Sequence, residues 1–292
     1  MGVTRKKSLS RGRPPTARPV NAAFSRRAAR TLINRHHHLE KKRQKAVKEG
    51  DETTAKAASA EITALGGLER YQQASLLGQS KGRGGDSSRV LLEWIKHSIS
   101  STDDRSRFPR IRMLEVGALS TTNACATSGY FETERIDLNS QAPGILQQDF
   151  MERPLPPGDS DCFDIISLSL VLNFVPEPAG RGDMLRHATA FLRVPDPALL
   201  TLRLLPSIFI VLPKSCLLNS RYCSEELFTD IMHSLGFSKV QRKVTGKLYY
   251  SLWRRDTATA SPTRPFPKKE INPGAKRNNF AVVLKTSESH KS

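Results

Sequence analysis

From residue 111 onward, short apolar runs alternate with amphipathic segments. The runs that predict buried strands lie at 111–116, 134–138, 145–150, 162–174 and 208–212. Helical patterns lie at 181–192 and from the cap residue Ser224 to Gly236, and two strand-like runs at 247–253 and 279–285 predict a final antiparallel pair. Strands that alternate with helices in this way predict an α/β fold with a mostly parallel, doubly wound sheet.

The first part of the chain has a different character. Residues 1–50 hold 15 Lys and Arg against two acids, which accounts for +13 of the net charge of +18. Residues 1–23 are proline-rich and cationic, typical of disorder, and residues 25–48 predict a long basic helix with a narrow apolar stripe. A second helical pattern follows at 61–78. We therefore expect a basic extension over 1–60, partly disordered and partly helical, and an α/β domain over 61–292.

Two interpretations of the basic extension stay open. A run of Lys and Arg is often a solvated tail or a nuclear-import signal. It is also typical of a surface that releases counterions from nucleic-acid phosphates, and this second interpretation is favoured. The tetrapeptide Arg11–Pro14 resembles the core of an AT-hook, although a single copy is more often part of a basic tail.

Composition narrows the class of protein. The four cysteines lack CxxC spacing and the three consecutive histidines at 36–38 have no cysteine nearby, so we expect no metal site. No apolar run approaches the roughly 20 residues that span a bilayer, and the basic N-terminus lacks the apolar core of a secretory signal. We expect an intracellular protein, in the nucleus or nucleolus, with no membrane partner.

A glycine and two acids carry the strongest chemical signal. Glu115 and Gly117 end the first strand-like run, and Asp137 ends the second. In an open α/β sheet, the glycine lets the backbone approach a nucleotide and the second acid accepts hydrogen bonds from ribose hydroxyls. Residues 118–120 lack the further glycines of a dinucleotide fingerprint, which disfavours NAD and FAD and favours S-adenosylmethionine. The alternative for Gly117 is a tight turn after a buried strand.

Further candidates follow the later strands. Asp149 either orients the adenine amino group or caps a turn. Asn173 can donate to and accept from the edge of a base, and Phe174 offers a stacking face; otherwise they are a turn cap and a core residue. Arg181 meets a phosphate or carboxylate, or simply caps a helix. Two loops stay undecided: 78–88, a hinge or a lid, and 219–222, a candidate substrate-side surface.

Several of these segments together resemble a known family. They include Glu115-Val116-Gly117, Ile136-Asp137-Leu138-Asn139-Ser140, Gln148-Asp149-Phe150, Leu172-Asn173-Phe174-Val175-Pro176 and Glu270-Ile271-Asn272-Pro273-Gly274. The chain resembles the fungal base methyltransferases that make N1-methyladenine in 25S ribosomal RNA. The segment 193–206, which connects the helical pattern at 181–192 with the fifth strand at 208–212, is longer than the resemblance leads us to expect.

The resemblance implies a class I (Rossmann-like) S-adenosylmethionine-dependent methyltransferase in residues 61–292. It also implies an adenine of 25S rRNA, naked or in a pre-60S particle, as substrate, a nucleolar location and a part in ribosome biogenesis. The resemblance also implies that Gly117 and Asp137 contact the cofactor. The pattern of strand ends in this sequence adds Glu115 and Asp149 as further candidate cofactor contacts. We expect Asn173 and Phe174 to act on the base. The alternative function is a sensor or assembly factor that binds S-adenosylmethionine without methyl transfer.

Overall fold

The computed structural model describes residues 26–67, 70, 86–99, 110–140, 142–194, 204–256 and 264–286. The AT-hook-like tetrapeptide, the predicted disorder over 1–23 and the glycine-rich stretch before Asp86 lie outside these residues. So does most of the long segment at 193–206.

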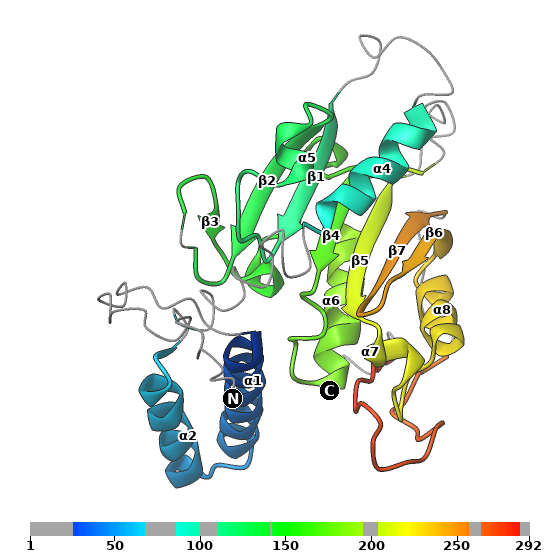
Figure 1. Cartoon of the computed structure of the whole chain (residues 1–292). Helices are drawn as coiled ribbons and strands as arrows, with labels where there is room; N and C mark the ends of the chain where they lie inside the picture. The colour runs from blue at the N-terminus through cyan, green and yellow to red at the C-terminus, as the bar shows by residue number, and fades with distance from the viewer. Residues whose placement is uncertain are drawn as a thin grey trace, which may run out of the picture.

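A seven-stranded sheet with the order β3-β2-β1-β4-β5-β7-β6 forms the centre of the α/β domain (Figure 1). Its strands are β1 Ile111–Val116, β2 Phe131–Asp137, β3 Leu146–Gln147, β4 Ile165–Ser169, β5 Ser207–Pro213, β6 Phe237–Val244 and β7 Leu248–Arg255. The first five pair in parallel and β7 runs antiparallel between β5 and β6. The predicted α/β fold with a mostly parallel, doubly wound sheet is therefore confirmed.

Helices cover both faces of this sheet. They are α4 Ser88–Ile99, α5 Ala124–Thr127, α6 Pro178–Ala190, α7 Ser215–Leu218 and α8 Glu225–Ser234, with short 3₁₀ turns η2 Phe150–Glu152 and η3 Asp159–Asp161. Pro178 begins α6, where its missing N–H costs nothing. The Ser224 hydroxyl caps α8 by accepting from Leu227 N at 3.1 Å, as the sequence predicts.

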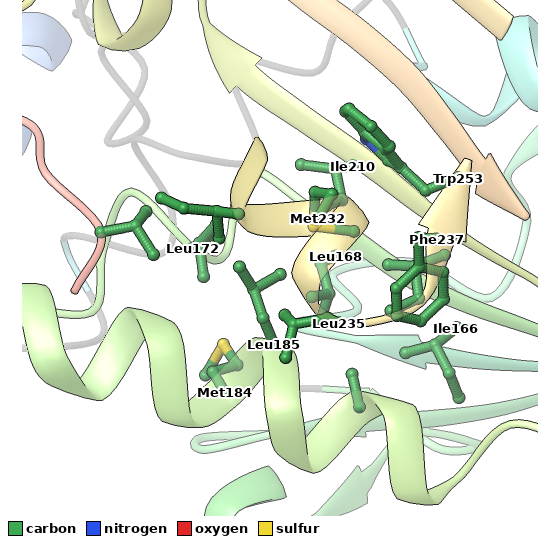
Figure 2. Close-up of a cluster of buried hydrophobic side chains, with 14 of the residues drawn as sticks. Ile166, Leu168, Leu172, Met184, Leu185, Ile210, Met232, Leu235, Phe237 and Trp253 are labelled. Atoms are coloured by element: carbon green, nitrogen blue, oxygen red, sulfur yellow. The ribbon is translucent and has the colours of Figure 1, made fainter. Parts of the chain in front are cut away.

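Alternate residues of each strand point to opposite faces and build two cores. Leu114, Ile166, Leu168, Ile210 and Trp253 pack against α6 and α8, and Figure 2 shows part of this cluster with Met184, Leu185 and Met232. On the other face, Met113, Ile165 and Phe209 pack against α4. The strands are buried on both faces, which explains why they read as continuous apolar runs.

The predicted final strand pair is wrong. The antiparallel partners of β7 are β5 and β6, and the sequence analysis missed β6 because this edge strand carries Lys239, Arg242 and Lys243 among its few apolar residues. Residues 279–285 are no strand of the sheet. They are apolar because they pack on α6, with Phe280, Ala281, Val282 and Leu284 buried.

Two further helices, α1 Arg26–Lys48 and α2 Glu52–Ala64, precede the α/β domain and form a hairpin through Gly50, which has a φ of +72°. Leu39, Ala46 and Ala58 are the buried apolar side chains of this pair. Helix α2 continues past residue 60, at which the sequence analysis placed the boundary between the basic extension and the α/β domain. In Figure 1 the hairpin lies toward the end of the molecule that holds the carboxyl ends of the parallel strands and α7.

Candidate active site

Gly117 stands where the loops after β1 and β4 meet. Its φ is +71°, a left-handed conformation that suits glycine, and its N–H donates to Ile136 O at 2.9 Å. A Cβ at this position would lie 2.7 Å from Val171 Cγ2. The glycine is therefore favoured by both conformation and space, because a side chain here would displace Val171. It lies at the carboxyl edge of the sheet, where open α/β sheets bind their ligands.

Asp137 ends β2 next to Gly117. Its Oδ1 accepts from Asn139 N at 2.8 Å, which fixes the turn that follows the strand. Its backbone O accepts from Gln148 N at 2.9 Å, so the loops after β2 and β3 are joined at the same edge. A carboxylate oxygen has two lone pairs, and Asp137 can accept from a ligand while it holds this turn.

Glu115 is largely buried beside the same edge. Both of its oxygens accept from Asn123 Nδ2, at 2.8 and 2.9 Å, and Arg135 Nε lies 3.8 Å away. Burial raises the pKa of Glu115, and the Asn123 hydrogen bonds and the Arg135 charge oppose that rise. Asn123 also caps α5 by accepting from Ala126 N at 2.9 Å. Glu115 thus holds the loop after β1 in place, and its contact with a cofactor stays a prediction.

Asp149 caps a turn. Its Oδ1 accepts from Met151 N at 2.8 Å and begins η2, so the capping alternative describes its position in this structure. It follows β3, one strand further from Gly117 than Asp137. A contact of Asp149 with adenine stays a prediction.

Asn173 lies in the loop after β4 and carries a buried polar atom, Oδ1, without a hydrogen-bond partner among the described residues. Buried polar atoms are almost always paired, so an orphaned acceptor at a sheet edge suggests that a ligand completes it. The loop is tightly held, because Phe174 N donates to Val171 O at 2.8 Å and Leu170 has a left-handed φ of +58°. A branched residue in this conformation marks strain of the kind found at functional sites.

Residues 86–88, at the end of the undecided loop 78–88, join this edge. Ser87 Oγ lies 2.7 Å from Ser169 Oγ at the end of β4. Asp86 accepts from Ser88 N at 2.9 Å and from Ala124 N at 2.5 Å, so it connects the starts of α4 and α5. The sequence analysis did not assign Asp86 to the site; its position two residues before a helix was the available signal.

Arg181 does not meet a phosphate or a carboxylate. Its side chain is buried, and its guanidinium donates to Val175 O at 2.9 Å, Pro176 O at 3.2 Å and Ala281 O at 2.6 Å. Burial lowers its pKa. The three nitrogen atoms of the guanidinium each donate to one of these backbone carbonyl oxygens, which compensates the buried charge. Its role is to join the loop after Asn173 to the end of the chain.

Two absences hold for the described ranges. They contain no group of three or more His, Cys, Asp or Glu side chains placed to hold a metal ion. None of their helices is both long and apolar enough to cross a bilayer.

Most of the chain is similar in sequence to proteins of one described family. Residues 56–282 match the family model described as "25S rRNA (adenine(2142)-N(1))-methyltransferase, Bmt2". The 25S rRNA (adenine(2142)-N(1))-methyltransferase of Saccharomyces cerevisiae is 39% identical over 225 residues, which are 77% of this chain and 62% of the relative. The match therefore spans less than two thirds of that relative. The 25S rRNA adenine-N(1) methyltransferase of Schizosaccharomyces pombe is 38% identical over 253 residues, 86% of this chain and 89% of the relative.

Solved structures with some similarity to this chain were found at low sequence identity. A 1,6-didemethyltoxoflavin-N1-methyltransferase of Burkholderia thailandensis with bound S-adenosylhomocysteine is 12% identical with a TM-score of 0.44, covering 63% of this chain and 87% of that one. An rRNA methylase of Escherichia coli is 14% identical with a TM-score of 0.36, covering 78% and 91%.

Proposed function

Because this chain belongs to the Bmt2 family of 25S rRNA (adenine(2142)-N(1))-methyltransferases, we propose that it methylates N1 of an adenine in 25S ribosomal RNA, with S-adenosylmethionine as the methyl donor. The single observation that carries the proposal is this family match, which includes every candidate residue of the sheet edge. The geometry of the edge supports it independently.

The residues present fit an adenosyl group. Gly117 adds no side chain of its own at the carboxyl edge of the sheet, where its left-handed backbone suits a glycine, and Asp137 offers a carboxylate on the neighbouring strand. Glu115, in β1, binds Asn123 of the loop that follows this strand, and Asp149 caps the turn after β3. When bound, S-adenosylmethionine supplies an electrophilic methyl group on a sulfonium. We propose that Gly117 and Asp137 hold its adenosine and that Glu115 acts mainly by fixing the loop after β1.

The base is held by the loop after β4. Adenine N1 carries a lone pair and no proton, so its attack on a methyl group needs no general base, and the rate comes from positioning. The adenine amino group is a donor, and Asn173 Oδ1 is a buried acceptor with no partner among the described residues. We expect Asn173 to accept from that amino group and the half-buried ring of Phe174 to stack on an unpaired or flipped base.

Methyl transfer is tested with labelled S-adenosylmethionine and unmodified 25S rRNA. Reverse transcription stops at N1-methyladenine, because the methyl group blocks Watson–Crick pairing. We expect a stop at one adenine, and we expect the Asp137→Ala protein to lose it through weaker cofactor binding. If the protein binds S-adenosylmethionine but transfers no methyl group either to naked rRNA or to pre-60S particles, the proposed methyltransferase activity is refuted and the cofactor-binding sensor is favoured.

The place of action is also part of the proposal. A substrate in the large ribosomal subunit, together with the basic residues 1–50, supports a nucleolar location and a role in ribosome biogenesis. Imaging of a fluorescent fusion, with and without residues 1–50, tests this. We expect nucleolar signal from the full chain and loss of nucleolar enrichment from the truncated one.

A further inference from the structure

Residues 264–286, which we call the arm, return to the carboxyl end of the sheet after β7 (Figure 1). Arg221, in the loop after α7, forms hydrogen bonds with several residues of the arm. The backbone O of Arg221 accepts from Ile271 N at 2.9 Å and Asn272 N at 3.1 Å, and its guanidinium donates to Gly274 O at 2.7 Å and Asn279 Oδ1 at 2.9 Å. The arm is therefore a folded part of the domain and is held from the substrate side of β5.

Arg181 connects the arm with the loop that bears Asn173. The guanidinium that binds Val175 O and Pro176 O also binds Ala281 O of the arm and lies over the ring of Phe280, 4.7 Å from its centroid. At Gly182, an added Cβ would lie 2.0 Å from Val283 O, so the arm backbone rests directly on α6. The arm and the base-accepting loop thus share one rigid support.

The exposed part of the arm is cationic. Its cationic tip, which we define as residues 268–277, holds Lys268, Lys269, Lys276 and Arg277 against the single acid Glu270. Glu270 Oε1 lies 3.7 Å from Arg221, and the three lysines form no ion pair with a described residue. Lys268 Nζ is held 4.4 Å above the ring of Tyr222. In contrast, Arg35, Arg43 and Lys45 of α1 each pair with a carboxylate.

We infer that the cationic tip binds the phosphodiester backbone of the RNA strand that carries the target base. The identity of the nucleic acid rests on the proposed function; the charge and position of the tip do not. Exposed lysines without carboxylate partners neutralise phosphates and release counterions, and they do so without reading sequence. The support shared through Arg181 places this surface on the same rigid unit as Asn173, so strand binding here would present a base to that loop.

The test is the salt dependence of RNA binding by the full chain. Single-stranded binding loses about 0.7 in the slope of log affinity against log salt for each phosphate contact removed. With a short single-stranded oligoadenylate as probe, we expect Lys268→Ala/Lys269→Ala to reduce the slope by about 1.4. The matched control is Lys56→Ala/Lys243→Ala, which removes the same charge from lysines already paired with Glu52 and Glu93. The control should keep the slope.

Methyl transfer gives a second measurement. The arm variant should raise KM for 25S rRNA and keep kcat and the affinity for S-adenosylhomocysteine. Equal slopes for the arm variant and the control would overturn the inference. If no RNA is methylated, the proposed function fails, yet the slope of oligoadenylate binding still decides whether the tip contacts phosphates.

Discussion

Replacing Asn173 by Ala separates a substrate contact from a structural one. Within the part of the chain that the structure describes, Asn173 Oδ1 is buried without a hydrogen-bond partner, and such an atom costs about 1–3 kcal/mol relative to its hydrated state. Asn173→Ala removes that cost together with some packing. We therefore expect the free energy of unfolding to change by less than about 1 kcal/mol.

Turnover should respond very differently. If Asn173 accepts from the adenine amino group during methyl transfer, the variant leaves that donor unpaired at a cost of about 1–3 kcal/mol, or roughly a 5- to 150-fold loss of kcat. Affinity for S-adenosylhomocysteine should stay unchanged. Denaturant unfolding, calorimetric cofactor titration and single-turnover methylation of 25S rRNA measure the three quantities.

The matched control is another asparagine at the same edge. Asn123 caps α5 through Ala126 N and donates to Glu115, so Asn123→Ala should lower the free energy of unfolding by about 0.5–2 kcal/mol. If Asn173→Ala loses as much stability as Asn123→Ala and keeps its turnover, Asn173 is only a turn cap. The reasoning from the orphaned oxygen would then be wrong.

Three further perturbations follow from the structure. Gly117→Ala should lower the free energy of unfolding by about 1–2 kcal/mol, because residue 117 has a left-handed conformation, and should also weaken cofactor binding in a calorimetric titration. Gly50 is the control: its φ is +72° and no atom lies within 4 Å of an added Cβ, so Gly50→Ala should lower only the stability. Hydrogen bonds to Glu225, of which that from Arg242 is the largest cause, lower the pKa of this carboxyl from 4.5 to about 2. Its contribution to the free energy of unfolding is therefore complete above about pH 4.5 and is lost as the pH falls toward 2. The free energy of unfolding of the Glu225→Gln protein should lack that acid dependence. Arg181→Lys places all donors on a single nitrogen, which cannot reach the three carbonyl oxygens that surround the planar guanidinium. This variant should lose about 1.5–3 kcal/mol in denaturant unfolding; an unchanged midpoint would show that the arm holds its place without Arg181.

The sequence alone predicted the class of fold and that Gly117 and Asp137 lie at one edge of the sheet. Parallel strands buried on both faces leave continuous apolar runs, and the residues that end them, Gly117 and Asp137, must meet at one edge of the sheet. These features are local in the chain, and the fold brings them together in any doubly wound sheet. The basic extension is likewise a property of composition.

Tertiary structure decided what no local pattern encodes. Edge strand β6 is half polar because one side faces solvent, and residues 279–285 are apolar because they lie on α6, so periodicity misassigned both. Arg181 has the chemistry to bind a phosphate, yet burial among backbone carbonyls makes it a connection to the arm. Whether a polar side chain contacts a ligand or its own chain depends on which acceptors lie within 3 Å or so, and that is settled only when segments about 100 residues apart pack together.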